Sequence, residues 1–159
     1  MNTQNTELFA QLNAGLHFNL SNDFGIIRAT GEDARSFLHS QLTQDIIHLS
    51  DTEVRLGAYC SAKGRMYAIF YVWCHEDAIY LLMHRSVVET VIKRLRMFVL
   101  RAKVVLEDAS AQFAITGYAG LNALSNKIKQ SDAQYTRLGI LPASLTEWGQ
   151  PNLPRQLRI

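Results

Sequence analysis

The alternation of apolar and polar positions changes period several times in the first half of the chain, and each change marks a predicted element. Residues 24–29 (F-G-I-I-R-A) form an apolar run that predicts a strand. Ala34, Phe37 and Leu38 follow at helical spacing. They predict a short amphipathic helix over residues 31–39 whose apolar face packs on a sheet.

Turn and cap signals surround this helix. Thr30 and Asp33 have the T-x-x-D form of a capping box, in which both side chains bind free backbone N–H groups at the start of a helix. Residues 61–65 (S-A-K-G-R) predict the tip of a hairpin, where Gly64 supplies a positive φ angle. Residues 66–73 are apolar on both alternating faces, which predicts a central strand covered on both sides.

Residues 86–100 carry the strongest helical pattern in the sequence. Ser86 and Glu89 form an S-x-x-E capping box at its start. Its basic residues fall outside the apolar stripe and predict a solvated face rather than a phosphate site. The predicted buried stripe is Val88, Val91, Ile92, Leu95, Phe98 and Val99. The basic residues are Lys93, Arg94, Arg96 and Arg101.

Shorter signals complete the chain. Predicted strands are residues 16–20, 78–83, 103–106, 113–116 and 135–141, and predicted helices are residues 5–14 and 121–128. Residues 131–159 are weakly patterned, and residues 145–159 with two prolines resemble a tail. Helices interleaved with adjacent hairpins predict an α+β fold with a mainly antiparallel sheet and packed helices, as a single domain over residues 1–159.

Composition and charge narrow the class of protein only slightly. The chain is 48% hydrophobic and 19% charged, which excludes general disorder, and its net charge of +2 is too small to indicate nucleic-acid binding. Cys60 and Cys74 lack metal-ligand spacing and predict reduced thiols. No signal peptide or apolar run of about 20 residues is present, so we expect a soluble, cytoplasmic protein without a membrane partner.

The sequence contains none of the common catalytic motifs. It lacks G-x-S-x-G, G-x-G-x-x-G, a Walker loop and H-E-x-x-H, and its five histidines are scattered. Asp45 is the best single carboxylate candidate, because it follows the predicted helix near Gln41 and Thr43. The alternative is that Thr43 and Asp45 cap a helical turn. Lys63 and Arg65 flank the hairpin tip, where they either meet an anionic ligand or belong to an ordinary exposed turn.

Two blocks of sequence carry a family pattern. The first is T-G-E-D-A-R-S-F-L-H-S-Q-L-T-Q-D-I at residues 30–46, and the second is L-G-A-Y-C-S-A-K-G-R-M at residues 56–66. Together they resemble the N-terminal folate-binding region of the YgfZ proteins, relatives of the glycine cleavage T-protein (aminomethyltransferase). The run L-R-M-F-V-L-R-A-K-V at residues 95–104 also fits. The resemblance is strongest over residues 16–120, and it implies a folate-binding α+β fold with tetrahydrofolate or a derivative as cofactor.

The sequence departs from these relatives in two places. In the T-proteins the hairpin tip continues G-G-x-x-D-D, and an aspartate there is tied to the chemistry on folate. Here residues 64–67 (G-R-M-Y) are followed by Ala68 and Ile69, so aminomethyl transfer is not expected. The YgfZ group also carries a later K-G-C-Y-x-G-Q-E signature that these 159 residues do not contain. We therefore expect a ligand-binding fragment without the later YgfZ domains, or a degenerate member.

The resemblance also implies ligand-binding residues, each with a structural alternative. Phe24 matches an aromatic residue of the family that meets folate; alternatively, Phe24 is a core aromatic residue at the start of a strand. The family's Q-x-T-x-D motif would present polar groups to the ligand, or fix the turn between helix and strand. Its K-G-R motif would attract the glutamate carboxylates of folate. The implied cofactor-binding residues are Phe24, Gln41, Thr43, Asp45, Lys63 and Arg65.

The sequence as a whole favours a folate-binding accessory protein over a conventional enzyme. The resemblance implies a role in assembling or repairing iron–sulfur clusters, including those of enzymes that thiolate tRNA, with iron–sulfur proteins as partners and no direct contact with nucleic acid. One alternative is a one-carbon transferase, in which Asp45 or Asp23 supplies the carboxylate near the pterin. The other is a structural or interaction domain that has kept the fold and lost the pocket.

Overall fold

The structure, a computed structural model, describes residues 16–119, 136–139, 145–148 and 155–158. The chain divides into two compact units: residues 21–112, and a unit that combines residues 1–20 with residues 113–159. Each unit contains a five-stranded sheet. The fold is α+β with mainly antiparallel pairing, as the sequence predicted. The single folate-binding-like domain over residues 1–159 stays a prediction.

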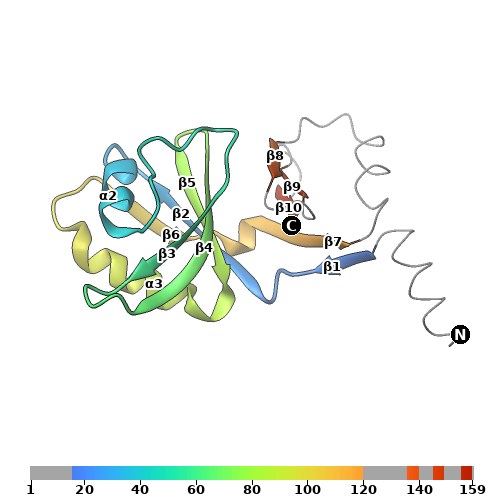
Figure 1. Ribbon diagram of the computed structural model, residues 1–159, viewed down its shortest axis with the longest axis horizontal. Helices are drawn as coiled ribbons and strands as arrows, with labels where there is room; N and C mark the ends of the chain where they lie inside the picture. The colour runs from blue at the N-terminus through green and yellow to red at the C-terminus, as the bar shows by residue number, and fades with distance from the viewer. Residues whose placement is uncertain (1–15, 120–135, 140–144, 149–154, 159) are drawn as a thin grey trace, which may run out of the picture. The chain divides into compact units, whose positions relative to one another are not determined.

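The unit of residues 21–112 is an antiparallel sheet with two packed helices (Figure 1). The strand order is β3-β4-β5-β2-β6, and each neighbouring pair is antiparallel. Its strands and helices are β2 (Phe24–Thr30), α2 (Ala34–Gln41), β3 (Arg55–Cys60), β4 (Met66–His75), β5 (Ala78–His84), α3 (Arg85–Val99), β6 (Val105–Asp108) and the short 3-10 helix η1 (Ser110–Gln112). The hairpin predicted at residues 61–65 joins β3 to β4, and Gly64 at its tip has φ of 76°.

Both helices pack on the same face of this sheet. One hydrophobic cluster joins the apolar sides of α2 and α3 to alternating residues of the strands, including Ile27, Phe70 and Leu81. Because side chains alternate along a strand, the residues between these point to the opposite face. We call this opposite face the outer face; it carries Phe24, Leu56 and Ile69.

The second unit supplies the other sheet, with strand order β1-β7-β10-β9-β8. Strand β10 pairs with β7 in parallel, and the other pairs are antiparallel. The strands are β1 (Leu16–Asn19), β7 (Phe113–Ala119), β8 (Thr136–Gly139), β9 (Leu145–Trp148) and β10 (Arg155–Arg158). Within residues 145–159, which the sequence predicted as a tail, the structure describes two strands, β9 and β10, which pair with each other and with β8 and β7. The helices predicted at residues 5–14 and 121–128 lie outside the described residues.

The cap predicted for the first helix was wrong. Strand β2 continues through Thr30, so α2 begins only at Ala34, with Asp33 as its N-cap residue. Asp33 makes no side-chain cap bond; its Oδ2 accepts the backbone N–H of Lys103 at 2.8 Å instead. The carboxylate thus ties the helix start to a segment 70 residues away.

The cap predicted for the second helix was also wrong. The N-cap is His84, whose Nδ1 accepts the backbone N–H of Ser86 at 3.3 Å. Glu89 pairs instead with Lys93 on the next turn, at 2.5 Å. The imidazole of His84, two positions before Ser86, therefore takes the role that the motif assigned to serine and glutamate.

Two predictions of burial need correction. Phe98 is 52% exposed although it falls on the predicted stripe of α3, whereas Val99 beside it is partly buried and packs against the core. Strand β4 lies between β3 and β5, but Met66 and Ile69 in its first half are 58% and 54% exposed. Coverage on both faces therefore begins only further along the strand.

The basic residues of α3 are only partly solvated. Arg94 lies 3.8 Å from the ring centroid of Tyr67 and donates to its hydroxyl at 2.6 Å. Arg96 donates to the backbone oxygen of Leu106 at 2.6 Å, on edge strand β6. These two arginines bind residues of strands β4 and β6, which leaves them less free to meet a ligand.

Candidate functional site

The two sequence blocks with the family pattern meet in space. Leu42 forms an isolated bridge with Tyr59, so the segment after α2 lies along edge strand β3. Thr43 is bonded to Ala58 through its backbone N–H, at 3.0 Å, and through Oγ1, which accepts the N–H of Ala58 at 2.8 Å. Thr43 therefore fixes the path of the chain after the helix, as its structural alternative predicted. Gln41, the last residue of α2, forms only a 3.3 Å bond from Nε2 to Ser40 Oγ among the bonds the structure describes.

Asp45 has its carboxylate engaged by its own loop. Oδ2 lies 2.7 Å from Nδ1 of His48, and Oδ1 accepts the backbone N–H of His48 at 3.2 Å. These bonds lower the pKa of Asp45, the side-chain bond to His48 most. Nδ1 of His39 lies 3.4 Å from Oδ1 and also accepts the N–H of Ile46 at 3.2 Å. Asp45 thus caps a turn, the alternative that the sequence left open.

Two arginines hold the loop that contains Asp45. Nη1 of Arg35 donates to the backbone oxygens of residues 46, 47 and 49, at 2.7, 3.3 and 2.9 Å. Arg55 donates to the backbone oxygens of residues 45 and 48, at 2.7 and 2.8 Å. The five consecutive carbonyls of residues 45–49 therefore accept hydrogen bonds from guanidinium groups, which hold the loop in place. Sequence reasoning missed both arginines, because their partners are backbone atoms that no motif reveals.

The hairpin tip presents two unpaired cations. Lys63 and Arg65 are exposed, and within the described part of the chain neither side chain forms a hydrogen bond or an ion pair. The tip itself is shaped by backbone and hydroxyl bonds of Ser61, including 2.8 Å from Gly64 N–H to Ser61 O. Both cations are therefore free to attract an anionic ligand.

Phe24 opens β2 and is partly exposed on the outer face. Its ring lies edge-on to His84, with centroids 6.5 Å apart. Strands β5, β4 and β3 separate it from the segment of Thr43, a distance of roughly 19 Å at ordinary strand spacing. The structure thus places Gln41 and Thr43 beside the β3–β4 hairpin and leaves Phe24 across the sheet. Leu56 and Ile69, 51% and 54% exposed, supply apolar surface between them.

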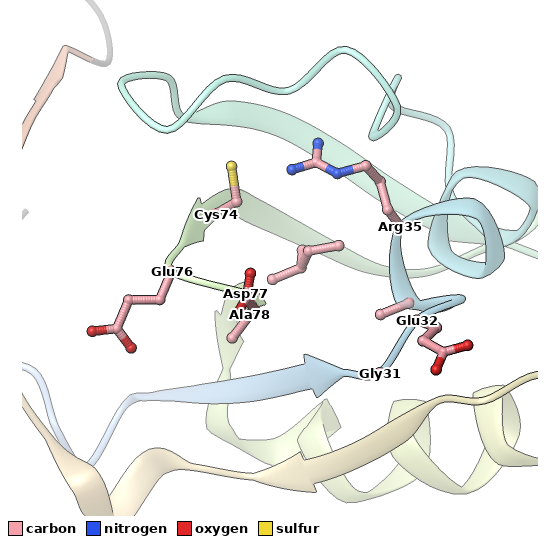
Figure 2. A pocket seen from close by; sticks show the side chains of 9 residues that line it. Gly31, Glu32, Arg35, Cys74, Glu76, Asp77 and Ala78 are labelled. Atoms are coloured by element: carbon pink, nitrogen blue, oxygen red, sulfur yellow. The ribbon is translucent and has the colours of Figure 1, made fainter.

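A pocket of about 570 Å³ lies elsewhere in the same unit, and none of the predicted site residues lines it. It is formed by the start of α2, the end of β4 and the β4–β5 turn, and Figure 2 shows its lining. The lining residues are Gly31, Glu32, Ala34, Arg35, Cys74, Glu76, Asp77, Ala78 and Ile79. Sequence reasoning missed this pocket, because two segments about 40 residues apart build it only after the sheet has formed.

The thiol in this pocket is buried and lies beside a carboxylate. Cys74 is 3% exposed, and its Sγ lies 3.3 Å from Asp51 Oδ1. Burial raises the pKa of the Cys74 thiol, which keeps it protonated at neutral pH. Within the described residues no group of three or more His, Cys, Asp or Glu side chains could hold a metal ion. The helices described there are also too short or too polar to cross a membrane.

Comparison with known proteins identifies homologues of this chain. No protein-family model matches it. It is 30% identical to the tRNA-modifying protein YgfZ of Aliivibrio fischeri over 103 residues, which cover 65% of this chain and 32% of that protein. It is 26% identical to the Vibrio vulnificus YJ016 protein of the same name over 139 residues, 84% of this chain and 42% of that protein. The Photobacterium profundum protein of that name is 34% identical over 88 residues, 55% of this chain and 27% of that protein.

The fold also has a solved counterpart. The crystal structure of glycine cleavage system aminomethyltransferase T from Bartonella henselae matches with a TM-score of 0.69 at 12% identity, over 87% of this chain and 39% of that one. The resemblance predicted from the sequence is thereby confirmed for both the YgfZ homologues and the aminomethyltransferase fold. The chain spans about a third of the length of the Aliivibrio fischeri relative, 32%.

Proposed function

From the homology of this chain to part of the curated tRNA-modifying proteins YgfZ, we propose that it binds tetrahydrofolate or a derivative and serves as an accessory factor in tRNA modification. In this proposal its partners are iron–sulfur proteins, whose clusters it helps to assemble or repair, and it works in the cytoplasm. Direct contact with nucleic acid is not part of the proposal.

The observation that carries the proposal is the meeting of the two family blocks at β3. Thr43 in the first block is bonded to Ala58 in the second, at 2.8 and 3.0 Å. Beside this junction the outer face offers the exposed side chains of Leu56 and Ile69. An apolar surface with few polar groups is the kind of surface on which a flat pterin or aminobenzoyl ring packs.

The charges around this surface fit an anionic ligand tail. Lys63 and Arg65 are unpaired in the described part of the chain, and both extend from the tip that follows β3. Folate carries glutamate carboxylates, which such cations attract. We therefore propose that the ring lies on the outer face and that the glutamate tail is directed toward the tip.

Asp45, one of the two carboxylates that could serve one-carbon transfer, is not free for that role. A transferase needs a carboxylate that is free to act near the pterin. Both oxygens of Asp45 are engaged by His48, at 2.7 and 3.2 Å, and the hairpin tip continues into Ala68 and Ile69 in place of the aspartates of the T-proteins. Mass-spectrometric detection of formaldehyde or methylene transfer by the purified chain would support the transferase instead.

Calorimetric titration with tetrahydrofolate and 5-formyl-tetrahydrofolate tests the proposal. We expect saturable binding by the intact chain and a loss of about tenfold in affinity for Phe24→Ala, because removing a stacking partner costs on the order of 1 kcal/mol. Phe98→Ala is the control, since Phe98 is an exposed aromatic residue that lies at the end of α3, away from the proposed site.

Absence of heat from a folded chain would contradict folate binding and favour a structural or interaction domain. If binding is found, adding the chain to an iron–sulfur reconstitution assay, with and without folate, tests the accessory role. If the chain does not change the rate of cluster formation either with or without folate, the accessory role is contradicted, whereas folate binding still stands.

A further inference from the structure

The pocket between α2 and the β4–β5 turn has a charge pattern that the proposed folate function does not use. Its lining contains Arg35 from the helix and Asp77 from the turn. In Figure 2 the guanidinium of Arg35 extends into the space beside Cys74, whereas the side chain of Glu76 extends away from it.

Arg35 forms no ion pair with a described carboxylate, although Asp51 Oδ1 lies 3.3 Å from Sγ of Cys74, the residue beside its guanidinium. The bonds the structure gives its Nη1 go to three backbone oxygens, of residues 46, 47 and 49. These neutral acceptors hold the group in place but leave its positive charge, and the described part of the chain offers it no ion pair. A guanidinium fixed in this way is an oriented site for a carboxylate.

Asp77 is the complementary group on the opposite segment. Its carboxylate forms no hydrogen bond or ion pair with the described residues. Glu32, the other carboxylate near the helix, is already paired with Lys103 at 2.7 Å. Among the described lining residues, one cation from α2 and one carboxylate from the turn thus stay unpaired.

Three of the other lining residues are apolar. Ala34, Ala78 and Ile79 are buried, with 3 to 4% of their surface exposed, and they line the space beside these charges. A volume of about 570 Å³ is within the range of small-molecule sites. An anion alone would leave Asp77 facing it, and a cation alone would leave Arg35 facing it, so a ligand with both charges fits best.

We propose that this pocket binds a small zwitterion, an α-amino acid with an apolar side chain, with its carboxylate at Arg35 and its ammonium group at Asp77. The apolar side chain then packs on Ala34, Ala78 and Ile79. The inference is independent of the folate proposal, because none of the six residues predicted to bind folate lines the pocket.

Titration of the full chain by ¹H–¹⁵N NMR tests the proposal with three probes of similar shape. L-Leucine carries both charges, 4-methylpentanoate only the carboxylate, and 3-methylbutylamine only the ammonium group. We expect leucine to shift the amides of residues 31–35 and 74–79 with a dissociation constant on the order of 0.1–1 mM, and each single-charge probe to bind about tenfold more weakly.

Two variants of neighbouring turn residues sharpen the test. Asp77→Asn should weaken leucine about tenfold, since a charge-assisted hydrogen bond is lost. Glu76→Gln should weaken leucine less than Asp77→Asn does, because Glu76 also lines the pocket but its side chain extends away from the space beside Cys74. Failure of leucine to shift these amides would overturn the proposal, as would equal affinity for 4-methylpentanoate, and neither outcome depends on a variant.

Discussion

At the scale of single residues, Asp45 shows how a predicted ligand group can serve the loop that carries it. Bonds from His48 lower the pKa of Asp45, so the folded state prefers its ionised form. A carboxyl group with a lowered folded-state pKa stabilises the protein above its unfolded value, about pH 4, and this contribution is lost as the pH falls through the folded-state pKa.

We therefore expect Asp45→Asn to lower the melting temperature at pH 6 and to have a smaller effect at pH 2.5. Thermal melts of the unmodified protein and of the variant at the two pH values measure this difference. Comparing the two proteins at each pH removes the loss of stability that acid causes in both. A deficit of the same size at both pH values would show that the ionised carboxylate does not contribute through His48.

Arg35 is a second residue, and its role is seen only in the structure. It holds three carbonyls of the loop, so Arg35→Met should leave these groups without their donor and lower the free energy of unfolding by about 2 kcal/mol. Urea denaturation measures this loss. Arg65→Met is the matched control and should change stability by less than about 0.5 kcal/mol, because Arg65 lies exposed at the hairpin tip. Equal losses would contradict the role of Arg35 in holding the loop.

At the scale of elements, two glycines with positive φ angles have very different surroundings. Gly64 has φ of 76° at the hairpin tip, and a Cβ there would meet no atom within 4 Å. Gly31 has φ of 113° before α2, and a Cβ there would lie 2.0 Å from the backbone oxygen of Lys103. Glycine is favoured at position 64 only because of its positive φ angle. At position 31 it is also favoured because the backbone of Lys103 leaves no room for a Cβ atom.

Alanine substitutions separate these two needs. Gly64→Ala should cost about 1 kcal/mol, the strain of a left-handed non-glycine residue. Gly31→Ala should cost at least about 3 kcal/mol, because backbone atoms must also move apart. Chemical denaturation of the two variants gives the comparison, and a Gly31→Ala loss no larger than that of Gly64→Ala would contradict the contact with Lys103.

The elements themselves follow the sequence pattern more closely than their ends do. β2, β5 and α3 lie where periodicity placed them, within one or two residues. Their caps do not, since His84 and the contact of Asp33 with Lys103 replace both predicted capping boxes. Periodicity reports burial of a whole face, whereas a cap depends on one side chain and on whichever partner the fold brings to it.

At the scale of the whole molecule, the proposed folate site combines the apolar outer face of β3 and β4 with the positive charges of the hairpin tip that joins these two strands. If the glutamate tail lies at the hairpin tip, the double substitution Lys63→Ala and Arg65→Ala should weaken polyglutamylated tetrahydrofolate more than the monoglutamate. We expect about tenfold for the polyglutamate at low salt, and a smaller effect at high salt because exposed charges are screened.

Competition titrations with mono- and polyglutamylated tetrahydrofolate at two salt concentrations measure this effect. Substitution of both residues by glutamine keeps polar side chains at the tip and tests whether charge alone is responsible. Equal losses for the two ligands would contradict the proposed direction of the tail, while leaving the proposed position of the ring on the outer face untouched.

The sequence by itself determined the α+β class, the order of strands and helices over residues 16–119, the glycine of the hairpin tip and the resemblance to YgfZ proteins. These features are local, because periodicity, turn residues and short motifs are properties of neighbouring positions. Only the tertiary structure decided the partners of Asp45, the clamp made by Arg35 and Arg55, and the pocket that contains Asp77. Each of these joins side chains to backbone atoms or to segments far away in sequence, which meet only when the sheet has formed.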